Sequence, residues 1–244
     1  MPTGTPLLEA SGLRKRFGAL VVLDGVDFAV RPDEAVGIVG PNGAGKTTLL
    51  NVLAGTYRPD GGRVLFRGED VSGRNAARRC RLGVGRAFQI PRPFGNMSVF
   101  ENVFVGAAAG AGGPRQQVYR RSIEALETCG LTQVANRRAE TLGLLYRKRL
   151  ELARALATDP SVVLLDEVGG GLTDAEADEL LATITGVRER GIAVVWIEHI
   201  VHVLVRGVER LVCMAEGRVI ADGEPAAVMR DAAVIDAYLG RAVA

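Results

Sequence analysis

The segment Gly40-Pro41-Asn42-Gly43-Ala44-Gly45-Lys46-Thr47 constrains the fold more than any other part of this 244-residue sequence. It matches the pattern G-x-x-x-x-G-K-[ST] in full. The apolar run Ala35–Val39 before it predicts a strand, and Lys46–Ala54 after it, stopped by Gly55, predicts a short helix. In this context the backbone N–H groups of the glycine-rich turn and the helix N-terminus face an anion. The segment therefore predicts a phosphate-binding loop in an α/β fold.

Four side chains would supply the chemistry of such a loop. Lys46 is placed to reach the β- and γ-phosphates of a nucleotide, and the Thr47 hydroxyl to ligate Mg²⁺. A second metal ligand is needed, and Asp166 provides one directly after the apolar run 161–165, at the carboxyl end of a predicted buried strand. The adjacent Glu167 is placed to orient or deprotonate an attacking water. These residues predict nucleotide hydrolysis.

The rest of the chain falls into stretches of different character. Short β-branched runs separated by turns predict strands in the first 71 residues, among them Leu20–Leu23, Phe28–Val30 and Val64–Phe66. Residues 91–159 show helical spacing, and we expect a flexible connection there at Gly106–Pro114. After Pro160, a strand, a helix and the strand 192–197 follow one another, which predicts a parallel sheet covered on both faces. A hairpin at 216–217, a helix opened by a proline at 225 and a short helix at 235–239 complete the chain.

Composition and charge exclude several classes of protein. Thirty basic and 28 acidic residues leave a net charge of +2, which gives no argument for a nucleic-acid partner. The longest apolar stretch, 192–205, is interrupted by an acidic residue and two histidines, so we expect no membrane span and no export signal. Any membrane role would then come through a partner.

Two scattered residue types favour ordinary structural roles. Cys80, Cys129 and Cys213 are far apart and lack CxxC spacing, so they are expected to be buried thiols of a reduced compartment. An arginine cluster lacks interleaved aromatic residues and is interpreted as a solvated surface. Its members are Arg74, Arg78, Arg79 and Arg81.

Taken together, these motifs resemble the nucleotide-binding subunits of ATP-binding cassette (ABC) transporters over essentially the whole length. Gln89, after the run 84–88, looks like the Q-loop of that family, and His199, after a strand, looks like its switch histidine. Phe17 looks like the aromatic residue that stacks on adenine. Each has a plainer alternative, because Phe17 could be a core aromatic residue, Gln89 a surface amide and His199 a solvated or capping histidine. Their order and spacing along one chain favour the functional interpretation.

The resemblance implies an α/β fold with a P-loop, RecA-like parallel-sheet core, an antiparallel β-subdomain and an inserted helical subdomain. The whole chain, 1–244, would form one ATPase domain, with the core and β-subdomain at 1–90 and 160–244 and the helical subdomain at 91–159. Implied catalytic residues are Glu167, His199 and Gln89, and implied magnesium contacts are Thr47, Gln89 and Asp166. Implied ATP-binding residues are Phe17, Val22, Asn42, Gly43, Ala44, Gly45, Lys46, Thr47 and Thr48.

The signature segment departs from the family. Family members usually have Leu-Ser-Gly-Gly-Gln there, a segment that binds the γ-phosphate held by the other subunit of a head-to-tail dimer. Alignment on the strong match 150–156 places Leu142 followed by Gly143, Leu144, Leu145 and Tyr146 at these positions. The serine hydroxyl and both glycines are missing, so the site on the partner's P-loop is expected to be impaired. We therefore favour a heterodimer with one good site over a homodimer.

Within the family, the closest resemblance is to the ATPases of branched-chain amino-acid importers, of the LivG type. It is carried by the stretches 88–94, 97–103, 149–154 and 234–240. Urea or amide importers and some lipopolysaccharide-export ATPases share much of this. Residues 89–103 would contact the membrane permease subunits, with Phe94 and Met97 as apolar anchors, unless these two pack inside the helical subdomain.

The resemblance thus implies an ATP-binding and ATP-hydrolysing importer subunit. It would bind ATP and Mg²⁺, assemble with permease subunits and a second ABC ATPase, and lie peripherally at the cytoplasmic face of the cell membrane. A cassette ATPase of DNA repair or translation is the first alternative, but such proteins usually carry long insertions or two cassettes. A regulatory partner that binds ATP without hydrolysing it is the second, and the intact Glu167 and His199 argue against it.

Overall fold

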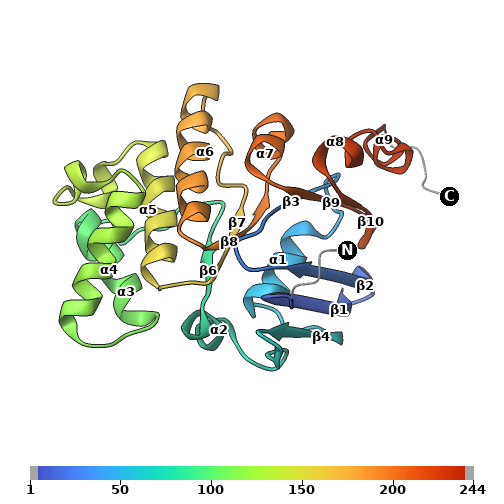
Figure 1. Ribbon diagram of the computed structural model, residues 1–244, viewed down its shortest axis with the longest axis horizontal. Coiled ribbons are helices and arrows are strands. Elements are labelled where there is room, and N and C mark those ends of the chain that lie inside the picture. Colours follow the sequence, from blue (N-terminus) through green and yellow to red (C-terminus); the bar gives the residue numbers. More distant parts are fainter. Residues whose placement is uncertain (1–4, 240–244) are drawn as a thin grey trace.

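The computed structural model describes residues 5–239, which form two sheets and the helices around them (Figure 1). The strands are β1 (Leu8–Phe17), β2 (Leu20–Val30), β3 (Ala35–Val39), β4 (Gly61–Phe66), β5 (Glu69–Asp70), β6 (Val84–Ala87), β7 (Val162–Asp166), β8 (Ala193–Ile197), β9 (Arg210–Ala215) and β10 (Arg218–Gly223). The α-helices are α1 (Lys46–Ala54), α2 (Ala76–Leu82), α3 (Val99–Ala109), α4 (Arg115–Thr128), α5 (Leu144–Ala157), α6 (Asp174–Glu189), α7 (Val201–Gly207), α8 (Pro225–Val228) and α9 (Ala232–Leu239). Two short 3₁₀ turns, η1 (Thr132–Val134) and η2 (Ala139–Thr141), precede α5.

The central sheet has the strand order β10-β9-β3-β8-β7-β6, with β3, β6, β7, β8 and β9 parallel and β10 antiparallel at the edge. Successive residues of a strand point to opposite faces. On β7, Val162 and Leu164 join the core around α1, whereas Val163 and Leu165 join the core on the other face. Because both faces are covered, the central strands are apolar throughout, as the sequence predicts.

The second sheet is antiparallel, with the order β2-β1-β4-β5. The two predicted runs at 20–23 and 28–30 belong to one strand, β2, and bulges shift its register with β1. Helix α1 lies between this sheet and the central sheet, and its buried residues Leu49, Leu50 and Leu53 share one core with both. This packing fixes the helix that begins at the phosphate-binding loop.

The helices divide between the two ends of the molecule. Helices α3, α4 and α5 pack on one another at one end, and α6 and α7 cover the central sheet (Figure 1). The antiparallel sheet lies at the other end, with α8 and α9 near β10. The predicted fold class, a parallel-sheet core with an antiparallel β-subdomain and a helical part, is confirmed. The subdomain boundaries at 91 and 159 stay a prediction.

Two element predictions were wrong in their bounds. The stretch Gly106–Pro114 is not wholly a flexible connection, because α3 continues through Gly106 to Ala109, and only 110–114 form the loop. A Cβ on Gly106 would lie 2.6 Å from the carbonyl oxygen of Arg154, so this glycine permits close packing of α3 on α5. The last helix begins at Ala232, three residues earlier than predicted.

The arginine cluster is only partly a solvated surface. Arg78 and Arg81 are exposed, but the side chain of Arg79 is fully buried. Its guanidinium donates to the carbonyl oxygens of Val52 and Leu53, at 2.7 and 2.8 Å, in the last turn of α1. The prediction was therefore wrong for Arg79, which caps a helix from a distant part of the chain.

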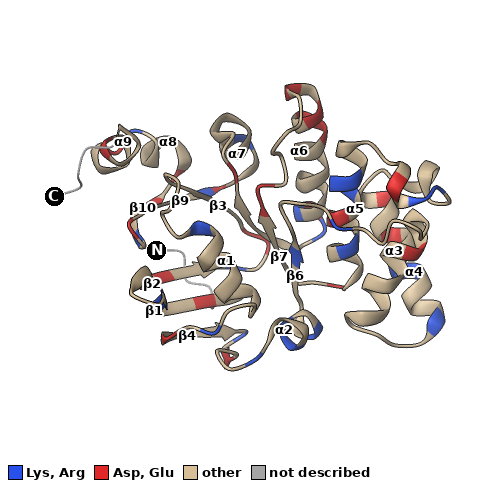
Figure 2. Ribbon diagram, turned by 180° about the vertical axis from the view of Figure 1, so that it is seen from behind, with Lys and Arg blue, Asp and Glu red and all other residues tan. Residues whose placement is uncertain are grey.

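The prediction of buried thiols is confirmed for two of the three cysteines. Cys129 and Cys213 are buried, but Cys80, on α2, is only half-buried; all three are free thiols. Acidic and basic segments are spread over both ends of the molecule (Figure 2). None of the helices within residues 5–239 combines the length and the apolar character that crossing a bilayer requires.

Candidate active site

The carboxyl ends of four neighbouring parallel strands bring the predicted residues together. The phosphate-binding loop follows β3, His199 follows β8, Asp166 ends β7 and Gln89 follows β6. Ligands in open α/β sheets bind at this edge. A cavity of about 200 Å³ opens there, lined by Val22, Asn42, Gly43, Ala44, Gly45, Lys46, Thr47, Thr48, Glu167 and His199.

The loop itself requires its glycines. Gly43 and Gly45 have φ angles of 81° and 99°, in the left-handed region that L side chains rarely adopt. A Cβ on Gly45 would lie 2.7 Å from the carbonyl oxygen of Val22. Gly45 precedes α1 with no side-chain cap, so the first N–H groups of this helix are available to an anion.

Lys46 is buried below the loop, with 6% of its surface exposed. Its Nζ donates to the carbonyl oxygens of Gly40 and Pro41, at 2.6 and 3.0 Å. Burial lowers the pKa of this ammonium group, and the nearby carboxylates of Glu167 and Asp166 oppose that shift. The loop therefore folds around a positive charge, which suits it to phosphate.

Thr47 and Asp166 form an oxygen-rich corner suited to a magnesium ion. Thr47 Oγ1 lies 3.4 Å from Asp166 Oδ1, and Arg86 Nη2 pairs with Asp166 Oδ2 at 3.0 Å. Burial raises the pKa of Asp166, and the guanidinium of Arg86 opposes that shift. Hydroxyl and carboxylate oxygens suit Mg²⁺, which usually takes one or two carboxylates together with substrate phosphates. Within residues 5–239, three or more His, Cys, Asp or Glu side chains are nowhere grouped so that they could hold a metal ion. A magnesium ion at this site would therefore need phosphate oxygens as further ligands.

Glu167 lies between the two other predicted catalytic residues. Its Oε1 is 2.6 Å from His199 Nε2, and its Oε2 accepts a hydrogen bond from the Gln89 amide. The residue has a φ of 49°, an unusual conformation for a side chain of this kind. The turn after β7 thus directs a half-buried carboxylate into the cavity next to the loop.

Phe17, predicted to stack on adenine, and Val22, predicted to bind ATP, lie in different environments. Val22 lines the cavity, but Phe17 does not. The Phe17 ring is 45% exposed and meets Tyr57 edge-on, with ring centroids 5.3 Å apart and an interplanar angle of 74°. Tyr57 had not been predicted as part of this aromatic surface.

The degenerate signature lies at the start of α5. Gly143 is the N-cap residue and offers no side-chain cap, while Leu145 is buried. Leu144 and Tyr146 are 44% and 38% exposed. The segment therefore exposes a leucine and a tyrosine at positions where ABC transporter subunits usually have a glycine and a glutamine.

Sequence reasoning missed two charged residues that support the site. Arg86 pairs with Asp166 and donates to Asn51 Oδ1 at 2.7 Å. Glu198 is 2% exposed and accepts hydrogen bonds from the backbone N–H groups of Gly169 and, at 3.0 Å, of His199. Only the position of Glu198 directly before the histidine could have indicated its role. Nothing local in the sequence pairs Arg86 with Asp166.

The segment after Gln89 is partly exposed. Phe94 is 47% exposed, its N–H donates to the buried Asn102, and Arg154 lies over its ring at 5.2 Å. Met97 is half-buried. Phe94 thus keeps an open face, and neither residue lies in the apolar core.

Two family patterns match the chain. The pattern of the family described as "ABC transporter" matches residues 23–169. A second, described as "Branched-chain amino acid ATP-binding cassette transporter", matches residues 218–244.

Individual relatives match over nearly the full length. The high-affinity branched-chain amino acid transport ATP-binding protein BraF of Pseudomonas aeruginosa is 38% identical, covering 97% of this chain and 99% of its own. LivG of Escherichia coli strain K12, with the same description, is 35% identical over the same shares. A crystal structure of a nucleotide-free ATP-binding cassette from an ABC transporter superposes with a TM-score of 0.88 at 29% identity, covering 96% of this chain and 99% of that one. The ADP conformation of an ABC transporter cassette gives a TM-score of 0.88 at 30% identity, covering 97% and 100%.

Proposed function

Because the chain belongs to the ABC transporter family, we propose that it is the ATP-hydrolysing subunit of an importer for branched-chain amino acids. As a member of this family it binds and hydrolyses ATP. The observation that carries the choice of solute is the match of residues 218–244 to the branched-chain pattern, because this segment lies outside the nucleotide-binding motifs. The 38% identity to BraF over 97% of the chain supports the same choice.

In this proposal the loop amides and Lys46 bind the phosphates. Backbone N–H groups of the loop and of the first turn of α1, which has no side-chain cap, together with the buried ammonium group would provide donors and positive charge for the triphosphate. The exposed aromatic surface of Phe17 and Tyr57, with Val22, would contact the base.

Mg²⁺ would be held by Thr47 and Asp166, with Gln89 as a further ligand, and would neutralise charge on the phosphates. Arg86 keeps the Asp166 carboxylate oriented through its 3.0 Å contact. Gln89 now donates to Glu167, so its amide would have to turn to present its oxygen to a metal.

Glu167 would act as the general base for water. It is held by His199 and Gln89, which fix both carboxylate oxygens. Water would replace one of these contacts and donate a proton to the carboxylate. His199, 50% exposed and fixed by Glu198 through its backbone, would then contact the γ-phosphate.

We further propose a head-to-tail heterodimer. Gly143, at the position of the usual serine, has no hydroxyl, and the exposed side chain of Leu144 crowds the approach to a phosphate, so this chain would contribute poorly to the site on a partner's P-loop. A partner with an intact signature would complete the site of this chain. The pair would bind two permease subunits at the cytoplasmic face of the membrane, and Phe94 would be an anchor.

Purification from detergent-solubilised native membranes tests this proposal. An affinity-tagged chain should be recovered with permease subunits and a second cassette subunit that has a serine and glycines in its signature. The complex in proteoliposomes should then take up leucine, isoleucine or valine with ATP inside. A Glu167→Gln complex should not, whereas Glu189→Gln, the same change at an exposed residue, should behave as the wild type.

Several outcomes would contradict the proposal. Uptake of urea or amides without uptake of branched-chain amino acids would refute the solute. Lipid export would refute the direction, and recovery with ribosomes or nucleic acid would refute transport. Recovery of two copies of this chain and no other cassette would refute the heterodimer.

A further inference from the structure

The C-terminal helix α9 reaches the beginning of the phosphate-binding loop. The backbone N–H of Gly40, the first loop residue, donates a hydrogen bond of 2.9 Å to the hydroxyl oxygen of Tyr238. The two residues are 198 positions apart in the sequence. The contact therefore joins the loop to the segment that matches the branched-chain pattern.

Gly40 has very little freedom to move. Its φ is 143°, and a Cβ at this position would lie 2.0 Å from the carbonyl oxygen of Met214 on β9. Its own carbonyl oxygen accepts the 2.6 Å hydrogen bond from Lys46 Nζ. The N–H of Gly40 is thus bound by α9, and its C=O by the lysine expected to bind phosphate.

The position of Gly40 leaves its N–H without a partner in the central sheet. The pairing of β3 with β8 extends to Ile38, and with β9 to Val39, so Gly40 lies past the end of both ladders. A partly buried N–H without an acceptor is unfavourable. Tyr238 supplies the acceptor that the sheet does not.

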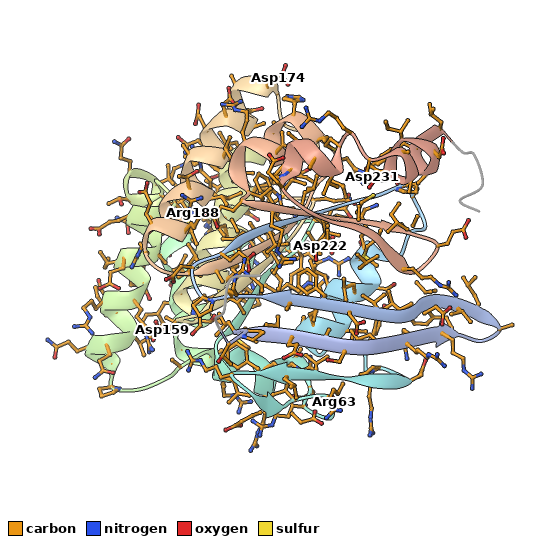
Figure 3. All side chains as sticks on the ribbon, turned by 45° about the vertical axis from the view of Figure 1, so that its right-hand side comes forward. Arg63, Asp159, Asp174, Arg188, Asp222 and Asp231 are labelled. Carbon is orange, nitrogen blue, oxygen red and sulfur yellow. The ribbon has the colours of Figure 1, made fainter. Side chains whose placement is uncertain are left out.

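Helix α9 is held in place independently of this hydrogen bond. Val234 is 1% exposed and belongs to the apolar core that covers one face of the central sheet, and a 2.8 Å hydrogen bond from the N–H of Ala233 to Asp231 Oδ1 caps the start of the helix. Asp231 lies between α8 and α9 (Figure 3). The tyrosine hydroxyl is therefore delivered by an anchored helix rather than by a free chain end.

We infer that Tyr238 is a positioning residue for the phosphate-binding loop. By accepting the hydrogen bond from Gly40, its hydroxyl holds the start of the loop in the arrangement that surrounds Lys46. Nucleotide affinity then depends on whether α9 is packed against the body of the protein in the position seen here. By thermodynamic linkage, nucleotide binding must in turn stabilise the helix in this position.

The substitution Tyr238→Phe removes the hydroxyl and keeps the ring. We expect the Kd for ADP with Mg²⁺, measured by calorimetry on the full-length chain, to rise roughly 3- to 10-fold, the value of one hydrogen bond. In ATPase assays of the complex, KM for ATP should rise by a similar factor while kcat stays within about twofold of the wild type. Tyr119→Phe is the matched control, because Tyr119 lies on α4, is 51% exposed and should leave both constants unchanged.

Two further measurements separate positioning from plain packing. Val234→Ala should loosen α9 and weaken ADP binding, although the hydroxyl is still present. Hydrogen exchange of the α9 amides in the wild type should slow when ADP binds, and this protection should shrink in Tyr238→Phe. An unchanged Kd in Tyr238→Phe, or a lowered melting temperature in both variants with normal ADP affinity, would overturn the inference.

Discussion

Replacement of Arg79 by methionine should strongly destabilise the chain, although its position in the sequence, among other arginines, predicts a solvated surface residue. The guanidinium is fully buried and donates four hydrogen bonds to backbone carbonyls, of Val52, Leu53, Arg74 and Ser72, at 2.7, 2.8, 3.1 and 3.3 Å. Burial lowers its pKa to about 10, so it is still protonated at neutral pH. It therefore places a full positive charge at the C-terminal end of α1.

The magnitude follows from the two shorter hydrogen bonds. Each hydrogen bond to a charged group contributes roughly 1.5 kcal/mol or more. Burying the charged guanidinium costs free energy that a buried methionine does not cost, and we take the two longer hydrogen bonds to compensate for it. Loss of the two short bonds then lowers the free energy of unfolding by about 3 kcal/mol, which for a chain of this size lowers Tm by about 6–12 °C.

Urea unfolding followed by circular dichroism measures this difference. Arg78→Met is the matched control, because Arg78 is exposed on the same helix and should change stability by no more than about 0.5 kcal/mol. A loss below about 1 kcal/mol in Arg79→Met, or an equal loss in Arg78→Met, would show that the buried guanidinium does not support α1.

Two further predictions concern buried ionisable groups. Burial raises the pKa of Cys129 to about 12 and that of Cys213 to about 11. Iodoacetamide at pH 7.5 should therefore alkylate Cys80 in the native chain, and all three thiols only after unfolding. Labelling of Cys129 or Cys213 in the native chain, detected by mass spectrometry, would contradict this. Burial tends to raise the pKa of Glu34, but hydrogen bonds and positive charge from Arg210 and Arg31 together outweigh it and lower the pKa below its ordinary value of 4.5. The stability that Glu34 contributes is therefore present above about pH 4.5 and lost as the pH falls through the lowered folded-state pKa. Between pH 6 and pH 3, the free energy of unfolding measured with urea should fall less in Glu34→Gln than in the wild type. An equal fall in both would refute the assignment.

The sequence was sufficient wherever local pattern decides structure. The phosphate-binding loop and α1 have the predicted bounds, because glycines, a strand and a helix stop lie within one short segment. The carboxyl edge was also predictable, since parallel strands bring their ends together. Asp166, Glu167 and the loop consequently lie where the pattern places them.

Contacts between distant segments could not be predicted. Arg79 and Arg81 look alike in the sequence, and only the position of α1 decides which one is buried. The same holds for Arg86, which meets Asp166 from the neighbouring strand, and for Tyr238, which reaches the loop from the far end of the chain. These residues follow from tertiary packing rather than from periodicity or motif.

In the proposed dimer, the altered signature of this chain would weaken the site on the partner's P-loop, whereas Glu167 would serve the site on its own P-loop. The segment 143–146 has no serine, whereas the loop, Asp166, Glu167 and His199 meet at one edge of the central sheet, where we propose the catalytic half-site of this chain. We therefore expect turnover to depend on this chain's own P-loop. The signature of the partner would complete it.

ATP turnover by the purified complex, with Glu167→Gln in this chain, tests that central claim most directly. If Glu167 is the general base, as we propose, its loss should lower kcat by at least about 100-fold while ATP binding is retained. The corresponding glutamine substitution in the partner cassette should leave most turnover intact. Full turnover in Glu167→Gln, or loss of turnover only when the partner is changed, would contradict the account.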